Sequence, residues 1–217
     1  MNILVFLGSA RTSTPPYPPR LGERVAYLCV HQINQGMNTA QLIDPLDYAL
    51  GSVFKPHFSY AKDKAPSDIE SLSRKIKEAD AYVMVSPEYN HSMSPALAHL
   101  LNHFGSSLFA FKPSAIVTYS AGQWGGVRAA VGMRAYLSEL GCLPVSAMVH
   151  IPKAHEVLAQ DGTFLKDVGT DKWQTYLGRT FTQLNWWAAA AKKQRIDSNP
   201  HKQSPAFEHD PSERNAP

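Results

Sequence analysis

Segments with the pattern of a buried strand alternate along this chain with segments that have helical periodicity. The clearest strand signal is residues 3–7, Ile-Leu-Val-Phe-Leu, where no polar residue interrupts the apolar side chains. An unbroken apolar run of this length is typical of a strand covered on both faces. We expect four further strands at residues 39–43, 81–86, 114–120 and 144–151. Each is followed by a predicted helix, which favours a parallel sheet.

The predicted helices begin near residues 21, 67, 94, 126 and 171. In the third, Ser94 and Pro95 form an N-cap and a first-turn proline. Its apolar positions follow the i, i+3, i+4, i+7 spacing: Leu97, Leu100, Leu101 and Phe104. Because right-handed crossovers leave few topologies, we predict an α/β, flavodoxin-like three-layer sandwich with a five-stranded parallel sheet of order 2-1-3-4-5.

Composition places the chain among globular proteins and sets the expected domain boundary. The 217 residues are 44% hydrophobic and 18% charged, enough for one well-packed domain with some length left over. We expect that domain to span residues 1–194. Residues 195–217 hold four prolines, mixed charges and few apolar side chains, so we expect a disordered tail.

Charge and cysteine content restrict the possible partners and compartment. A net charge of +3, without a long basic run, does not predict nucleic-acid binding. No stretch has the pattern of a signal peptide or a membrane span. Cys29 and Cys142 are predicted to be ordinary buried thiols, which fits a reducing compartment. These features together favour a cytoplasmic protein.

Polar loops follow the first, third and fourth predicted strands, at residues 8–11, 86–92 and 120–126, and we call them the first, second and third loop. Ligands of open parallel sheets bind beyond the carboxyl ends of the strands. We therefore expect the three loops to converge on a single site.

The first loop has the composition of an anion site. It joins a strand to a helix, where backbone N–H groups and the helix dipole favour negative charge. Ser9 and Ser13 offer hydroxyl groups, Arg11 offers a forked pair of donors, and Arg20 would close the cradle. The pattern GxGxxG is absent, which disfavours a Rossmann dinucleotide-binding fold. The pattern GxxxxGK(S/T) is also absent, which excludes a P-loop nucleoside triphosphatase. On this loop alone, a simple helix cap with an exposed Arg11 explains the residues equally well.

The second loop is suited to a tight turn beside a flat ligand. Pro87 fixes φ, and Asn90 tolerates unusual backbone angles. Tyr89 adds a flat apolar surface with a polar tip. An ordinary turn with Glu88 on the surface is the alternative.

The third loop contains two adjacent glycines, Gly125 and Gly126, which permit close approach of backbone to a ligand. Gln123 could bond to a pyrimidine edge, and Trp124 could pack near a ring. One anion-binding loop combined with two loops suited to a flat ring indicates flavin mononucleotide (FMN).

The three loops and their flanks resemble the NADPH-dependent FMN reductase family of flavodoxin-like proteins, which includes quinone, azo and chromate reductase-like members. The similarity runs from residue 2 to about residue 191. The stretches that carry it are GSAR at 8–11, RLGERVA at 20–26, LIDP at 42–45, ADAYVMVSPEYNHSMSPAL at 79–97 and VTYSAGQWGGVRAA at 117–130.

This resemblance implies an oxidoreductase that passes a hydride from NADPH or NADH, through N5 of FMN, to a quinone, flavin, azo or similar acceptor, without a catalytic side chain. It implies that Ser9, Arg11 and Arg20 bind the phosphate. The segment 12–20 is longer and richer in proline than the usual phosphate loop of the family, so Ser13 is an alternative to Arg20 as a phosphate ligand. The residues implied to line the ring are Pro87, Glu88, Tyr89, Asn90, Ser120, Gly122, Gln123, Trp124, Gly125 and Gly126. A homodimer or homotetramer, with the flavin near a subunit boundary, is also implied.

The sequence has three alternatives to this interpretation: an electron carrier, a partner-binding protein and a metal site. A flavodoxin-like electron carrier would use the same site, although such carriers tend to be acidic. A flavin-dependent partner-binding protein would use the proline-rich residues 15–19 and the tail. A metal site is not predicted, because His99 and His103 share a helix face without an HExxH pattern or a third carboxylate ligand.

Overall fold

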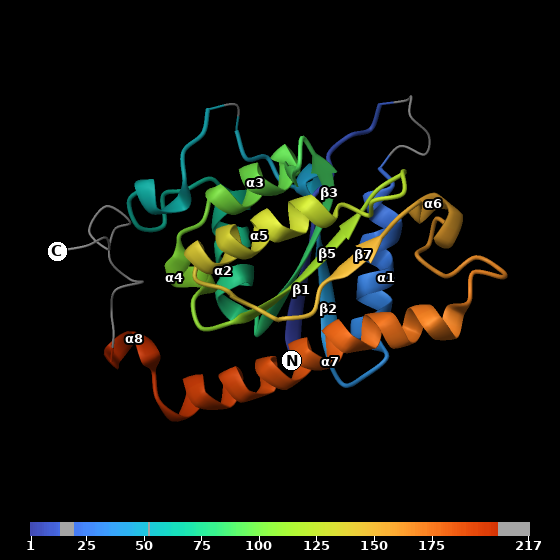
Figure 1. Cartoon of the computed structure of the whole chain (residues 1–217). Helices are drawn as coiled ribbons and strands as arrows, with labels where there is room; N and C mark the ends of the chain where they lie inside the picture. Colours follow the sequence, from blue (N-terminus) through green and yellow to red (C-terminus); the bar gives the residue numbers. More distant parts are fainter. Residues whose placement is uncertain (14–19, 52, 204–217) are drawn as a thin grey trace.

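The structure is a computed structural model that describes residues 1–13, 20–51 and 53–203, and it consists of one sheet with helices on both faces (Figure 1). The strands pair in the order β2-β1-β3-β5-β6, and β7 also pairs with β5. All of these pairs are parallel. The strands are β1 (Asn2–Leu7), β2 (Thr39–Ile43), β3 (Ala81–Tyr89), β5 (Pro113–Tyr119), β6 (Leu143–Pro144) and β7 (Val149–Ile151). The predicted α/β, flavodoxin-like class and order are confirmed, with β6 and β7 together in the fifth position.

Two hydrophobic cores lie on opposite faces of this sheet. The α-helices of the described residues are α1 (Gly22–Asn34), α2 (Ser67–Glu78), α3 (Pro95–Asn102), α4 (Ser106–Phe109), α5 (Val127–Glu139), α6 (Ala154–Val157), α7 (Thr170–Asp197) and α8 (Pro200–Gln203). Ile3, Val5 and Leu7 of β1 pack with α1 and α7, whereas Leu4 and Phe6 pack with α2, α3 and α5. Both faces of β1 are therefore covered, as its continuous apolar run predicts.

The start of α3 follows its sequence signals. The Ser94 hydroxyl accepts a hydrogen bond from the backbone N–H of Leu97 at 3.1 Å, and Pro95 is the first helical residue. Leu97 and Leu100 are buried in the core beneath the helix. This cap fixes the point at which the second loop joins α3.

The fifth strand differs from the prediction, because residues 144–151 do not form one continuous strand. They are divided between β6 and β7. Between the two, Arg134 Nη1 donates to the carbonyl oxygen of Val145 at 3.0 Å. The side-chain oxygen of Gln183 accepts from the backbone N–H of Ala147 at 3.2 Å. Side chains of α5 and α7 thus replace part of the strand ladder, and the sequence pattern carries no sign of these distant partners.

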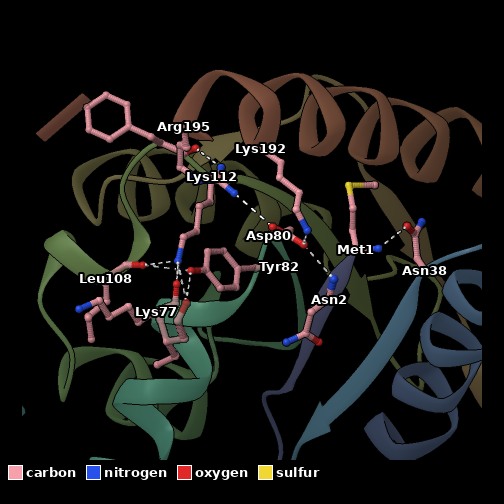
Figure 2. Close-up of polar contacts among 12 residues, drawn as sticks. Met1, Asn2, Asn38, Lys77, Asp80, Tyr82, Leu108, Lys112, Lys192 and Arg195 are labelled. Atoms are coloured by element: carbon pink, nitrogen blue, oxygen red, sulfur yellow. Dashed lines mark hydrogen bonds and ion pairs between the residues drawn. The ribbon is translucent and has the colours of Figure 1, made fainter. Parts of the chain in front are cut away.

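At the amino edge of the sheet, Asp80 joins three segments of the chain (Figure 2). Its carboxylate accepts from the backbone N–H of Asn2 at 3.0 Å, from Lys192 Nζ at 2.9 Å and from Arg195 Nη2 at 3.3 Å. The start of β1, the start of β3 and the last turns of α7 are therefore held together.

A buried lysine lies beside this carboxylate. Lys112 Nζ donates to the carbonyl oxygens of Ile76, Lys77 and Leu108 at 2.7 to 2.9 Å. The Tyr82 hydroxyl shares two of these acceptors (Figure 2). Burial lowers the pKa of Lys112 to about 7. The lysine therefore closes the last turn of α2 against the sheet.

Helical structure continues past residue 194. Helix α7 continues to Asp197, and α8 follows. Arg195, assigned to the tail by its sequence context, donates from Nη1 to the carbonyl oxygen of Phe111 at 2.8 Å. Its bond to Asp80 adds a second anchor, which explains why the helix does not end where the charged residues begin. Residues 204–217 and the proline-rich residues 14–19 lie outside the described part of the chain.

Candidate functional site

The three loops begin side by side at the carboxyl edge of the sheet. Strand register pairs Leu7 with Val85 and Pro87 with Tyr119, so β1, β3 and β5 end next to one another. The N–H of Gly8 continues this pairing with a 2.7 Å bond to the carbonyl oxygen of Val85. In Figure 1 this edge is at the top, opposite the N-terminus and α8.

Arg20 connects the first loop to the end of β2. Its Nη2 donates to both carboxylate oxygens of Asp44, at 2.7 and 2.8 Å, and to the carbonyl oxygen of Ser9 at 2.8 Å. Its Nη1 donates to Glu23 at 2.9 Å. Arg20 adopts a left-handed backbone conformation, with φ of +48°, which a residue with a Cβ adopts only at some cost. Most of its donors thus hold the protein together, where the sequence suggested phosphate contacts.

One donor of Arg20 remains available for an anion. Its Nε is buried and has no hydrogen-bond partner among the described residues. In addition, no side chain caps the N–H groups at the start of α1, whose N-cap residue is Leu21. A buried unpaired N–H and an uncapped helix start both favour an anion, so these residues fit the phosphate of FMN.

Ser9 and Arg11 belong to the first loop, whose Ser9 carbonyl oxygen accepts from Arg20. Ser9 is buried and its hydroxyl bonds to the Tyr119 hydroxyl, whose pKa is raised by burial, so Tyr119 stays a neutral phenol. That phenol fills the space beside Gly22, where a Cβ would overlap it. Arg11 is half-buried and donates from Nη1 to the carbonyl oxygen of Ser13 at 3.0 Å.

The second loop is a tight hairpin. Strand β3 runs to Tyr89, three residues past the predicted end, and pairs antiparallel with β4 (Ser92–Met93). Asn90 and His91 make the turn with φ of +49° and +63°. Two successive positive φ angles are those of a type I′ turn, and Asn is among the residues that tolerate them. The hairpin leaves Tyr89 44% exposed at the rim.

The third loop is held by its own serine. Ser120 Oγ accepts from the N–H of Gly125 at 2.8 Å and donates to the carbonyl oxygen of Gly122 at 2.7 Å. Gln123 is exposed, and Trp124 is 60% exposed. Ser120 therefore shapes the loop, while these two side chains face outward.

The glycines of this loop differ in how much space surrounds them. A Cβ on Gly125 would lie 3.1 Å from the backbone nitrogen of Pro152, and one on Gly126 would lie 2.9 Å from Cβ of Thr118. At Gly125 and at Gly126, other atoms of the protein therefore occupy the space that a Cβ would need. A Cβ on Gly122 would have no heavy atom within 4 Å. Gly122 is therefore the position at which a ring could approach this backbone.

Three residues of the site were missed from the sequence. The sequence pattern marks Asp44 only as the end of a strand, Tyr119 only as a strand residue, and Arg128 only as part of a helix. Each acts through a partner 24 to 110 positions away: Arg20, Ser9 and Glu88. Clusters made by such long-range contacts leave no local pattern in the sequence.

Other clusters carry less chemistry. The rings of His99 and His103 are 4.7 Å apart, but no group of three or more His, Cys, Asp or Glu side chains in the described ranges is arranged for a metal. Cys29 and Cys142 are buried, and burial raises both thiol pKa values, that of Cys142 to about 12. No helix in the described part is long and apolar enough to cross a membrane.

Comparison with known proteins gives a family match for the region that carries all three loops. The profile of NADPH-dependent FMN reductase matches residues 1–156. The chain belongs to this family. Among characterised family relatives, an NADPH azoreductase of a Bacillus species is 31% identical over 111 residues, 50% of this chain and 61% of that protein. An NAD(P)H-dependent FMN reductase of Pseudomonas aeruginosa is 32% identical over 106 residues, 47% of this chain and 57% of that protein. The chain thus matches less than two thirds of the length of either relative.

Solved structures show how widely this FMN reductase family fold is shared. FerB of Paracoccus denitrificans, a flavoenzyme NAD(P)H:acceptor oxidoreductase, superposes with a TM-score of 0.62 at 19% identity, covering 86% of this chain and 96% of FerB. An oxidoreductase of Corynebacterium diphtheriae gives 0.61 at 12% identity, covering 87% and 97%. At these identities the similarity establishes the fold.

Proposed function

We propose that this member of the FMN reductase family binds FMN across the three loops and uses it to transfer electrons from NADPH or NADH to a small acceptor. The observation that carries the proposal is the uncapped start of α1 beside the buried, unpaired Nε of Arg20, within a loop cluster of this family. A phosphate supplies the missing acceptor for both.

The phosphate end of the proposed site uses the first loop. N–H groups of the first turn of α1 and the Nε of Arg20 donate from inside the fold. Arg11 covers the outer side with a guanidinium that suits phosphate oxygens. Ser9 orders the loop through Tyr119, and Ser13 contributes its carbonyl oxygen to holding Arg11.

The ring end uses the second and third loops. The backbone of the hairpin from Pro87 to Asn90 borders one side, with Tyr89 at its rim. Gly122 leaves open space on the other side, and Gln123 and Trp124 provide an amide and an aromatic surface there. Ser120, Gly125 and Gly126 keep this backbone in place from behind. The chain therefore orients the ring with main-chain groups and excludes water with two aromatic side chains.

Bound FMN supplies hydride and electron transfer, and the chain supplies binding and orientation. Relatives whose names specify azoreductase, FMN reductase and quinone reductase activity make azo compounds, free flavins and quinones the first acceptors to test. We further propose a homodimer or homotetramer, with the flavin near the subunit boundary, as the functional form; multi-angle light scattering tests it.

The decisive experiment is an FMN titration followed by anaerobic mixing with NADPH. Saturable binding, followed by bleaching of the flavin absorbance, supports the reductase. Binding without bleaching by NADPH or NADH supports an electron carrier instead. Absence of a binding isotherm contradicts the proposal and leaves only the fold and the family.

A further inference from the structure

Helix α5 begins without a capping side chain of its own. Its N-cap residue is Gly126, with φ of +76°. The 2.9 Å between a Cβ at this position and Cβ of Thr118 leaves no room for Ser, Asp or any other capping residue. The first N–H groups of α5 must therefore find their acceptor elsewhere.

The acceptor is Glu88, which comes from the second loop. Its Oε2 accepts from the backbone N–H of Arg128 at 3.1 Å and of Ala129 at 3.4 Å. Its Oε1 lies 3.5 Å from Nη1 of Arg128, and the Glu88 side chain is only 13% exposed. A negative charge at this end is also favoured by the helix dipole. The sequence placed Glu88 beside the ring; in the structure its carboxylate caps a helix.

The same contact extends into the third loop. The Arg128 guanidinium lies 5.2 Å from the ring centre of Trp124, in a cation–π contact. The Glu88 carboxylate therefore forms an ion pair with the Arg128 guanidinium, and this guanidinium in turn contacts the exposed Trp124 ring. This chain of contacts joins the second loop to the third loop through the first turn of α5.

We propose that Glu88 is a positioning residue that, through Arg128, sets the place of Trp124 relative to the second loop. The inference rests on the proposed function for its purpose, since the two loops flank the proposed ring site. It also explains why the phosphate would bind at the start of α1 and not at the start of α5. Because Glu88 occupies the start of α5, that helix cannot take the phosphate, and the uncapped α1 remains for it.

The test begins on the protein without FMN. In Glu88→Ala, exchange of the Arg128 and Ala129 amide hydrogens should accelerate about tenfold, since a hydrogen bond to a charged group is lost. Glu88→Gln keeps an oxygen that can accept from these amides, so it should restore much of the protection while losing the ion pair with Arg128. As a control, Glu139→Gln removes the same charge from the far end of α5. It should change the exchange rate of neither the Arg128 nor the Ala129 amide hydrogen. Unchanged exchange in Glu88→Ala overturns the inference.

Trp124 gives the readout that a simple helix cap would not move. Acrylamide quenching of Trp124, isolated by subtracting the Trp124→Phe signal, should rise in Glu88→Gln and equally in Arg128→Met. The double variant should show no further rise, because both act through one contact. Normal quenching in Glu88→Gln, or additive effects in the double variant, overturns the positioning role.

FMN affinity then separates this inference from the proposed function. If the inference holds, Glu88→Gln and Arg128→Met weaken FMN binding by the same factor, about threefold to tenfold, whereas Glu139→Gln binds like the wild type. Wild-type affinity in both variants overturns the inference alone. A wild-type protein that binds no FMN contradicts the proposed function, while the exchange and quenching results still decide whether Glu88 positions Trp124.

Discussion

Two valine substitutions in the third loop distinguish a glycine required by the fold from one that faces the proposed ligand. Gly125 has φ of +62°, and its Cβ would lie 3.1 to 3.2 Å from backbone nitrogens of Pro152 and Ile151. A left-handed conformation costs a residue with a Cβ about 1 to 2 kcal/mol, and the backbone shift adds to this. Gly125→Val should therefore lower the free energy of unfolding by about 2 to 3 kcal/mol.

Gly122→Val should behave in the opposite way. No heavy atom lies within 4 Å of the added Cβ, and Gly122 has no positive φ. Its free energy of unfolding should stay within about 0.5 kcal/mol of the wild type. If the flavin ring approaches this backbone, FMN affinity falls at least about tenfold, equal to about 1.4 kcal/mol.

Urea unfolding and an FMN titration on both variants measure these effects. Wild-type FMN affinity in Gly122→Val would move the ring away from this loop. Wild-type stability in Gly125→Val would contradict the packing of the loop against residues 150–152. Only the combination of a stable protein that binds FMN poorly at Gly122 and a destabilised protein at Gly125 agrees with the structure.

Three further predictions concern charge and thiols. Arg11→Ala should weaken FMN binding by about 2 kcal/mol, and an unchanged dissociation constant would place the phosphate elsewhere. Because burial lowers the pKa of Lys112 from 10.5 to about 7, the unfolded chain binds more protons between these values, so the free energy of unfolding should rise with pH across that window. Lys112→Met should lack this rise in urea titrations at several pH values; equal slopes in both proteins would show that the carbonyl oxygens fully offset burial. Cys29 and Cys142, whose thiol pKa values are raised by burial, should react with a thiol reagent at pH 8 only after unfolding. Rapid labelling of the native protein would contradict their burial.

The sheet was predictable from sequence because its signals are local. The apolar run of β1 and the Ser94 cap of α3 depend on neighbouring residues, and strand–helix alternation then fixes the order. The position of the three loops follows from that order. The roles of their side chains do not, because Arg20 turns to Asp44 and Glu88 turns to the start of α5. A glycine pair likewise looks the same in sequence whether a ligand or the chain's own backbone lies beside it.

The interruption between β6 and β7 has a consequence for association between molecules. A continuous eight-residue strand at the border of the sheet would display a row of unpaired N–H and C=O groups, which another chain could use as a template. Here the two strands are two and three residues long, and Arg134 and Gln183 engage backbone groups between them. This border therefore offers another chain only two short, separated stretches of backbone to pair with.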